Sequence, residues 1–153
     1  MKRTKEQLAE AIAEAIRHEE GFYVTEAAIK SGAVKGAFRQ DTGKWQTIAQ
    51  WLNNPGNLRR WRRNGKPLPT VQTLSGTFVR FETLEDGCRT HRSLVTQYIE
   101  GKYHGGKVPT LREFFATYAP KGDGKNDPLR YAEKVAARIG VTDIDAPLSE
   151  LIQ

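Results

Sequence analysis

Hydrophobic positions recur at helical spacing over residues 5–20, which predicts an amphipathic first helix. Its apolar face carries Leu8, Ala11, Ile12, Ala15 and Ile16, and its polar face carries Glu10, Glu14, Arg17 and His18. Thr4 followed by Gln7 is typical of a helix start, and Gly21 of a helix end. At about 100° per residue, Glu19 falls inside the apolar stripe and Glu20 at its edge. We therefore expect either carboxylate to be partly buried.

The rest of the chain has the patterns of further helices and of one strand. Three stretches with helical periodicity are expected to form helices: residues 84–100, 110–118 and 128–139. Asp127, Pro128 and Gly140 are suitable cap residues for the last of them. The shorter segments are a helical turn at 47–52, a strand-like alternation at 76–82, a glycine-containing cleft wall at 22–44 and a tail turn at 141–153. This predicts an α+β, predominantly helical fold: one domain over 1–153, with a small β element and a cleft between helical lobes.

Composition limits the possible classes of protein. With 38% hydrophobic and 27% charged residues, the chain resembles an ordinary globular protein. No apolar run approaches the roughly 20 residues of a membrane span, and the charged N-terminus lacks the features of a signal peptide. We therefore expect synthesis in a cytoplasm. The net charge of +6 favours a polyanionic partner, which could be nucleic acid, an anionic membrane or a cell wall.

Metal, cofactor and disulfide chemistry have no signature in the sequence. Cys88 is the single cysteine, so it has no disulfide partner within the chain and is expected to be a small buried hydrophobe. The three histidines lack ligand spacing, and no phosphate-binding or dinucleotide fingerprint is present. We expect neither a metal nor a cofactor.

Three amide side chains surround a Pro-Gly pair in the segment Asn53-Asn54-Pro55-Gly56-Asn57. Pro55 and Gly56 restrict the shapes of this loop, and amides suit the N-acetyl and hydroxyl groups of sugars because each offers a donor and an acceptor. A single Asn in such a turn is more often structural. Arg59 could bind a carboxylate as a fork.

The basic segment that follows, residues 59–66, contains Trp61. It could stack on sugar faces or on nucleobases. It could equally be a solvated loop that Trp61 anchors to the core.

Glu19 and Glu20 are candidates for a general acid. A group that protonates a glycosidic oxygen must be neutral near neutral pH, which burial, a neighbouring carboxylate and the negative end of a helix dipole all favour. An ordinary charged helix end is the alternative interpretation. A second carboxylate could be Asp41, Glu82, Glu85 or Asp86.

The order of these segments resembles the phage-encoded, lysozyme-like peptidoglycan hydrolases of endolysins and virions. The similarity covers roughly residues 8–148, and its matching pieces are Glu20-Gly21-Phe22, the segment 53–59, Phe81, Glu85, Gly87, Arg89, Leu94, Tyr98, Thr110-Leu111, Tyr118-Ala119-Pro120, Asp123, Asn126, Tyr131, Val135 and Gly140-Val141.

This resemblance implies a lysozyme-like, two-lobed fold that cleaves the β-1,4 bond between the two amino sugars of peptidoglycan. It selects Glu20 over Glu19 as the acid. From their own chemistry we expect sugar binding by the loop and the residues after it, through Asn53, Asn54, Asn57, Arg59 and Trp61, and the resemblance adds Tyr131. Tyr131 is similar to a tyrosine on a helix of lytic transglycosylases, although it could be a core aromatic.

One departure from the family leaves the mechanism open. Many phage lysozymes follow the glutamate closely with Asp or Cys and then Thr, whereas this chain has Val24-Thr25-Glu26 and no aspartate before Asp41. A lytic transglycosylase with Glu20 as sole acid and base is therefore at least as well supported as a hydrolase. We expect a monomer that reaches the wall through a pore protein, a secretion system or a virion. The alternatives are a non-catalytic wall-binding virion protein and, less favoured, a nucleic-acid binder on residues 59–66.

Overall fold

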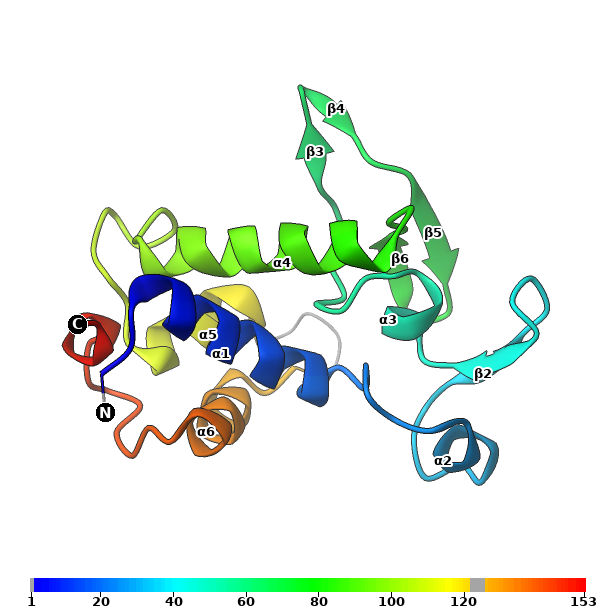
Figure 1. The fold of residues 1–153 in the computed structure, drawn as a ribbon, viewed down its shortest axis with the longest axis horizontal. Helices are drawn as coiled ribbons and strands as arrows, with labels where there is room; N and C mark the ends of the chain where they lie inside the picture. The colour runs from blue at the N-terminus through cyan, green and yellow to red at the C-terminus, as the bar shows by residue number, and fades with distance from the viewer. Residues whose placement is uncertain (1, 122–125) are drawn as a thin grey trace. The chain divides into compact units, whose positions relative to one another are not determined.

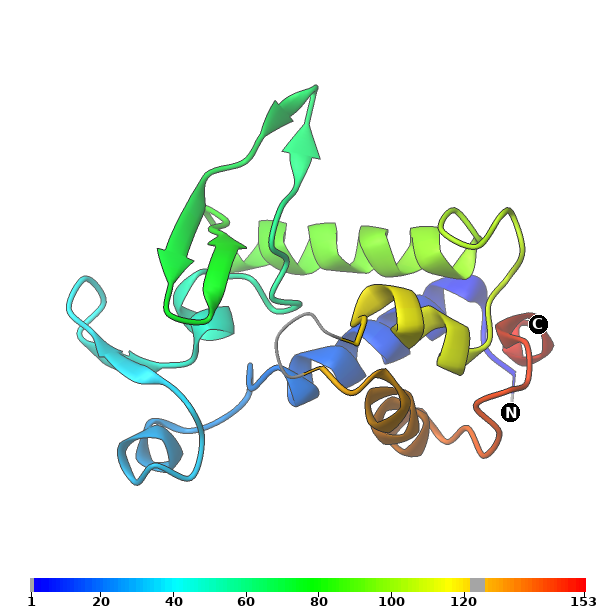
Figure 2. The same cartoon turned by 180° about the vertical axis from the view of Figure 1, so that it is seen from behind.

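A computed structural model describes residues 2–121 and 126–153. The chain divides into two compact units, one formed by Met1–Ala15 with Arg92–Gln153 and the other by Ile16–His91. Figures 1 and 2 show the two groups of elements from opposite sides. The single domain expected over 1–153 stays a prediction. Asp123, one of the positions that carry the family resemblance, lies outside the described residues.

The predicted helices are confirmed with nearly the expected ends. They are α1 (Lys5–Glu19), α4 (Leu84–Ile99), α5 (Leu111–Tyr118) and α6 (Pro128–Ile139), and the tail contains a short 3-10 helix, η1 (Leu148–Leu151). Thr4 and Gln7 form the expected capping box at the start of α1, with hydrogen bonds of 2.9 and 3.1 Å. Asp127 caps α6 through the Arg130 amide, and Gly140 ends it in the left-handed conformation.

The first unit is held together by apolar helix faces and an aromatic cluster. Helices α5 and α6 pack on each other, as Figure 2 shows. The rings of Phe114 and Phe115 lie 4.7 Å apart, and Tyr131 of α6 stacks on Phe115 at 4.6 Å. Arg3 pairs with Ile152 in a parallel bridge that fastens the tail. The periodic hydrophobic residues therefore account for this unit.

The second unit contains short elements around irregular loops. Its helices are α2 (Glu26–Lys30) and α3 (Ile48–Trp51), and its strands are β1 (Ala37–Arg39), β2 (Lys44–Gln46), β3 (Arg62–Arg63), β4 (Lys66–Pro67), β5 (Thr70–Thr73) and β6 (Gly76–Val79). Over the described residues the strands form three antiparallel pairs, β1-β2, β3-β4 and β5-β6.

The α+β class is thus confirmed, but the expectation of one small β element is wrong. The β3–β4 hairpin turns at Asn64 and Gly65, which both have positive φ, at 53° and 75°. An Asn-Gly pair favours a tight two-residue hairpin turn, because both residues tolerate positive φ. The residues on either side of the pair are charged and do not alternate between apolar and polar, so no strand pattern marks this hairpin in the sequence. Within residues 2–121 and 126–153, no helix has both the length and the apolar character needed to cross a bilayer.

Candidate functional site

A pocket of about 430 Å³ lies within the second unit. It is formed by the end of α1, the segment before and within β1, the start of α3, the Asn57 loop and the turn between β5 and β6. Its lining consists of Glu19, Glu20, Gly21, Val34, Lys35, Gly36, Ala37, Arg39, Thr47, Ile48, Asn57, Thr73, Leu74, Ser75 and Phe78. Among the described residues of this lining, the only carboxylates are Glu19 and Glu20.

Helix α3 fixes the backbone that follows Glu20. The Thr47 hydroxyl accepts the amide of Gln50 at 3.2 Å and donates to the Gly21 carbonyl, also at 3.2 Å. The Gln50 side-chain amide donates to the carbonyls of Phe22 and Val24, at 3.0 and 2.9 Å. Gly21 turns the chain with φ of 74°, a conformation that favours glycine. The backbone from Gly21 to Val24, which directly follows Glu20, is therefore held by side chains 26 to 28 residues away in sequence.

Asn54 holds the Asn-rich loop in shape. Its side chain is fully buried, and its amide donates to the carbonyls of Leu58 and Val79, both at 2.9 Å. Its carbonyl oxygen accepts the Leu58 amide at 2.8 Å. All three hydrogen-bond partners are backbone groups, so the Asn54 side chain satisfies the loop backbone in the way that a neighbouring β-strand would. The side chain of Asn54 thus has a structural role in the loop, and its role in sugar binding stays a prediction.

Two glycines let this loop pack directly on neighbouring elements. A Cβ on Gly87 of α4 would lie 1.8 Å from the Asn53 carbonyl oxygen, and one on Gly56 would lie 2.3 Å from the His91 ring. Asn53 also donates its side-chain amide to the Phe81 carbonyl at 3.2 Å. Asn53 faces these supports and is not part of the pocket lining. The loop is therefore immobilised on both sides.

Asn57 is the amide that this frame delivers to the pocket. It adopts φ of 51°, which Asn tolerates better than most residues. Its side-chain amide donates to Glu20 Oε2 at 2.8 Å. Asn57 Oδ1 is buried and has no hydrogen-bond partner among the residues that the structure describes. The pocket thus joins a carboxylate with an amide that fixes its orientation and that has one buried oxygen without a hydrogen-bond partner among the described residues.

The remaining predicted binding residues lie outside the lining. The Arg59 guanidinium lies 4.8 Å above the Phe78 ring, so it borders the pocket through that ring. Trp61 is half-buried in the following segment, where its carbonyl accepts the Leu68 amide at 2.8 Å. Tyr131 belongs to the other compact unit and stacks on Phe115 there. Of the predicted acid and sugar-binding residues, Glu20 and Asn57 both line the pocket and are joined by a hydrogen bond.

The candidates for a second carboxylate are also outside the pocket lining. Asp41 accepts the Trp51 indole N–H at 2.9 Å, and Asp86 binds Arg63 at 3.0 Å. Glu85 pairs with Arg89 at 3.7 Å on the surface of α4, and Glu82 is exposed. Glu19, which is adjacent to Glu20, is the remaining acid in the pocket.

Sequence reasoning missed the cations of the pocket. The Lys35 ammonium donates to Ser75 Oγ at 2.8 Å, which joins the segment before β1 to the β5–β6 turn. Arg39 lies 4.3 Å from the centre of the Trp51 ring, and burial lowers its pKa. Both cations lie in the stretch predicted to form a cleft wall, and their charge was the signal that could have identified them.

His91 packs against the Asn-rich loop at Gly56, and the buried Arg17 lies close enough to affect the charge of His91. The helical pattern predicts an exposed Arg17 on the polar face of the first helix, but this is wrong, because Arg17 is only 7% exposed. Burial, together with the nearby Arg17 charge, lowers the pKa of His91 to about 3. His91 is therefore neutral at physiological pH. A neutral ring can pack against Gly56 without the cost of a buried charge.

The described part of the chain contains no group of three or more His, Cys, Asp or Glu side chains placed to hold a metal ion. No protein-family model matches the chain, and no curated protein or solved structure matches it either.

Proposed function

We propose that this protein is a peptidoglycan-cleaving glycosidase with a lysozyme-like fold, in which Glu20 is the general acid. Its substrate bond is the β-1,4 linkage between N-acetylmuramic acid and N-acetylglucosamine. The observation that carries the proposal is the 2.8 Å hydrogen bond from Asn57 to Glu20 at the wall of a pocket of about 430 Å³. The similarity of the segments to lysozyme-like proteins supports it further.

In this proposal the two oxygens of Glu20 have different tasks. Oε2 accepts the Asn57 N–H, so the transferable proton belongs on Oε1. Oε1–H then protonates the leaving glycosidic oxygen as the C1–O bond breaks. Asn57 acts as a positioning residue, because it fixes the rotation of the carboxyl group.

The lining favours a mechanism that needs a single acid and base. Hydrolysis uses a second carboxyl group that activates water or attacks the sugar at a defined separation. Glu19, the other acid of the pocket, is the adjacent residue on α1 rather than a group on a facing wall. In a lytic transglycosylase the Glu20 carboxylate instead takes the proton of the substrate's own C6 hydroxyl. That oxygen closes on C1 and leaves a 1,6-anhydro sugar.

The decisive experiment is digestion of purified bacterial cell walls, with mass spectrometry of the released fragments. Wild-type protein is expected to release muropeptides. Because hydrolysis adds one water and transglycosylation adds none, an anhydro product is lighter than the hydrolysed one by about 18 Da. Glu20→Gln should reduce the rate by a factor of about 10² to 10⁴. Glu19→Gln, the matched control one residue away, should retain most of the activity.

Three outcomes contradict this proposal. Full activity in Glu20→Gln would show that another residue is the acid. Loss in Glu19→Gln alone would transfer the role to that residue. Wall binding without release of any fragment by folded wild-type protein would support a non-catalytic wall-binding protein instead. Circular dichroism of each variant establishes that the fold is intact.

A further inference from the structure

Positive charge is concentrated in one part of the second unit. Residues 42–81 contain seven of the 24 Lys and Arg residues and none of the 18 Asp and Glu residues. The rest of the chain therefore has 17 cations and 18 acids, and is close to neutral. All seven cations are exposed, and five of them are arginines: Lys44, Arg59, Arg60, Arg62, Arg63, Lys66 and Arg80. The net charge of the protein thus belongs to this segment.

The densest part of it is a projecting hairpin, residues 59–67, which we call the basic arm. Figure 1 shows β3 and β4 at the far end of this arm, beyond β5 and β6. Arg60, Arg62 and Lys66 are exposed, and none of them forms an ion pair with a residue whose position the structure gives. Surface cations with no internal counter-charge suit an external anion.

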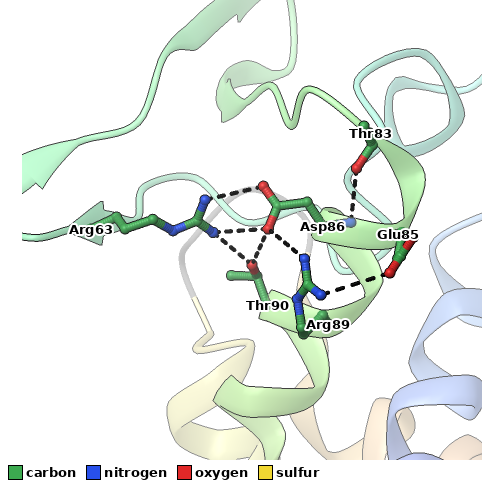
Figure 3. A network of polar contacts seen from close by, with 6 residues as sticks. All are labelled: Arg63, Thr83, Glu85, Asp86, Arg89 and Thr90. Carbon is green, nitrogen blue, oxygen red and sulfur yellow. Dashed lines mark hydrogen bonds and ion pairs between the residues drawn. The ribbon is translucent and has the colours of Figure 1, made fainter.

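The arm is fixed to α4 through Arg63. Figure 3 shows Arg63 bound to both oxygens of Asp86, at 3.0 and 3.1 Å, and to the Thr90 hydroxyl at 3.1 Å. Arg89 approaches the same carboxylate at 3.9 Å, and Thr83 accepts the Asp86 backbone amide. The hydrogen bonds from Arg63 hold the pKa of Asp86 below its usual value. Arg63 is therefore an anchor that orients the other cations of the arm.

The arm begins at the edge of the pocket. Asn57 lines the pocket, and Arg59 two residues later lies over Phe78, which also lines it. A Cβ on Gly76 would lie 2.3 Å from the Arg59 guanidinium, so this cation rests directly on the start of β6. A polymer whose sugar occupies the pocket would therefore pass next to the basic arm.

We propose that the basic arm binds the carboxylates of the stem peptides on the same peptidoglycan strand whose sugars occupy the pocket. This inference rests on the proposed function and specifies its substrate as peptide-bearing glycan rather than bare glycan. The excess of Arg over Lys fits the choice, because a guanidinium forms paired hydrogen bonds with a planar carboxylate. The anions are attached to the polymer itself, so the arm and the pocket act on one ligand.

The test measures binding to insoluble cell walls, with Glu20→Gln in every sample so that nothing is digested. One batch of walls keeps its stem peptides, and the other is treated with an amidase that removes them and leaves the glycan. The arm variant is Arg60→Gln/Arg62→Gln/Lys66→Gln. Its control is Lys2→Gln/Lys30→Gln/Lys107→Gln, three exposed cations outside residues 42–81 whose loss changes the net charge equally.

At low salt, we expect the protein with the unmodified arm to bind peptide-bearing walls about tenfold more tightly than the arm variant does. This difference in affinity should become smaller at about 0.5 M salt. The control should bind like the unmodified arm, and amidase treatment should remove the difference between arm and arm variant. Equal binding to stripped and intact walls would overturn the proposal. So would unchanged binding by the arm variant, or tighter binding to duplex DNA than to walls, which would indicate a phosphodiester ligand.

Failure of this inference can be told from failure of the proposed function. The wall digestion with wild-type protein tests cleavage alone, and the wall-binding comparison tests the arm alone. Cleavage without an effect of the arm would overturn only the inference about stem peptides. Binding through the arm without cleavage by wild-type protein would overturn only the proposed glycosidase activity.

Discussion

Replacement of Gly87 by Ala tests how tightly the Asn-rich loop is packed on α4. In an isolated helix this change would stabilise by about 1 kcal/mol, because Gly is a poor helix former. In the folded protein the new Cβ would lie 1.8 Å from the Asn53 carbonyl oxygen and 3.2 Å from Pro55 Cδ. Real Cβ atoms essentially never come closer than 3.0 Å to such atoms, so loop and helix must separate by at least 1.2 Å, the difference between 3.0 and 1.8 Å.

The loop cannot move that far without losing contacts. The buried hydrogen bonds of Asn54 and the bond from Asn53 to the Phe81 carbonyl attach the loop to β6 and the residues that follow it. Overpacking of this kind costs about 1–3 kcal/mol, and each lost buried hydrogen bond about 1 kcal/mol more. After subtraction of the helix-propensity gain, we expect Gly87→Ala to destabilise by about 2 kcal/mol. For a chain of this length that lowers the melting temperature by roughly 4–8 °C.

Urea unfolding at pH 7, followed by circular dichroism, measures the free energy of unfolding directly. Ser93→Ala is the control, because Ser93 is an exposed position of the same helix where the substitution should be neutral or slightly stabilising. Gly87→Ala should also slow wall cleavage, since it displaces the loop that presents Asn57 to Glu20. A Gly87→Ala protein as stable as wild type, or more stable, would refute the close packing of loop and helix.

Three further outcomes follow from the same supports. Asn54→Ala should destabilise by about 3 kcal/mol in urea unfolding, because it leaves buried backbone groups without partners; a loss under 1 kcal/mol would contradict that role. The His91 pKa is lowered to about 3, so an unfolded chain binds a proton near pH 6.5 that the folded protein rejects. Stability should therefore be complete above pH 6.5 and fall by up to about 1.4 kcal/mol per pH unit as pH decreases toward 4.5, and a flat series of urea midpoints would show a solvated ring. A double-mutant cycle of Arg63→Gln and Asp86→Asn should give a coupling of about 0.5–1 kcal/mol that weakens in 1 M salt, and additive effects would mean that the pair does not anchor the arm.

The sequence by itself determined the helices, because their signals are local. The apolar period, the Thr4–Gln7 pair and the Asp127 and Gly140 caps act within one or two turns of chain, and α1 and α6 formed as they predict. The placement of Glu20 at the end of α1 follows from the same pattern. The rigidity of the Pro-Gly loop is likewise a property of its own residues.

Only the tertiary structure decided what each amide of that loop does. Asn54 reaches a carbonyl 25 residues away and is buried, whereas Asn57 reaches Glu20 across 37 residues. The burial of Arg17 and the pairing of the three hairpins depend on similarly distant partners. Composition and periodicity describe a residue's neighbours along the chain, but hydrogen-bond partners and burial depend on groups that only folding brings close.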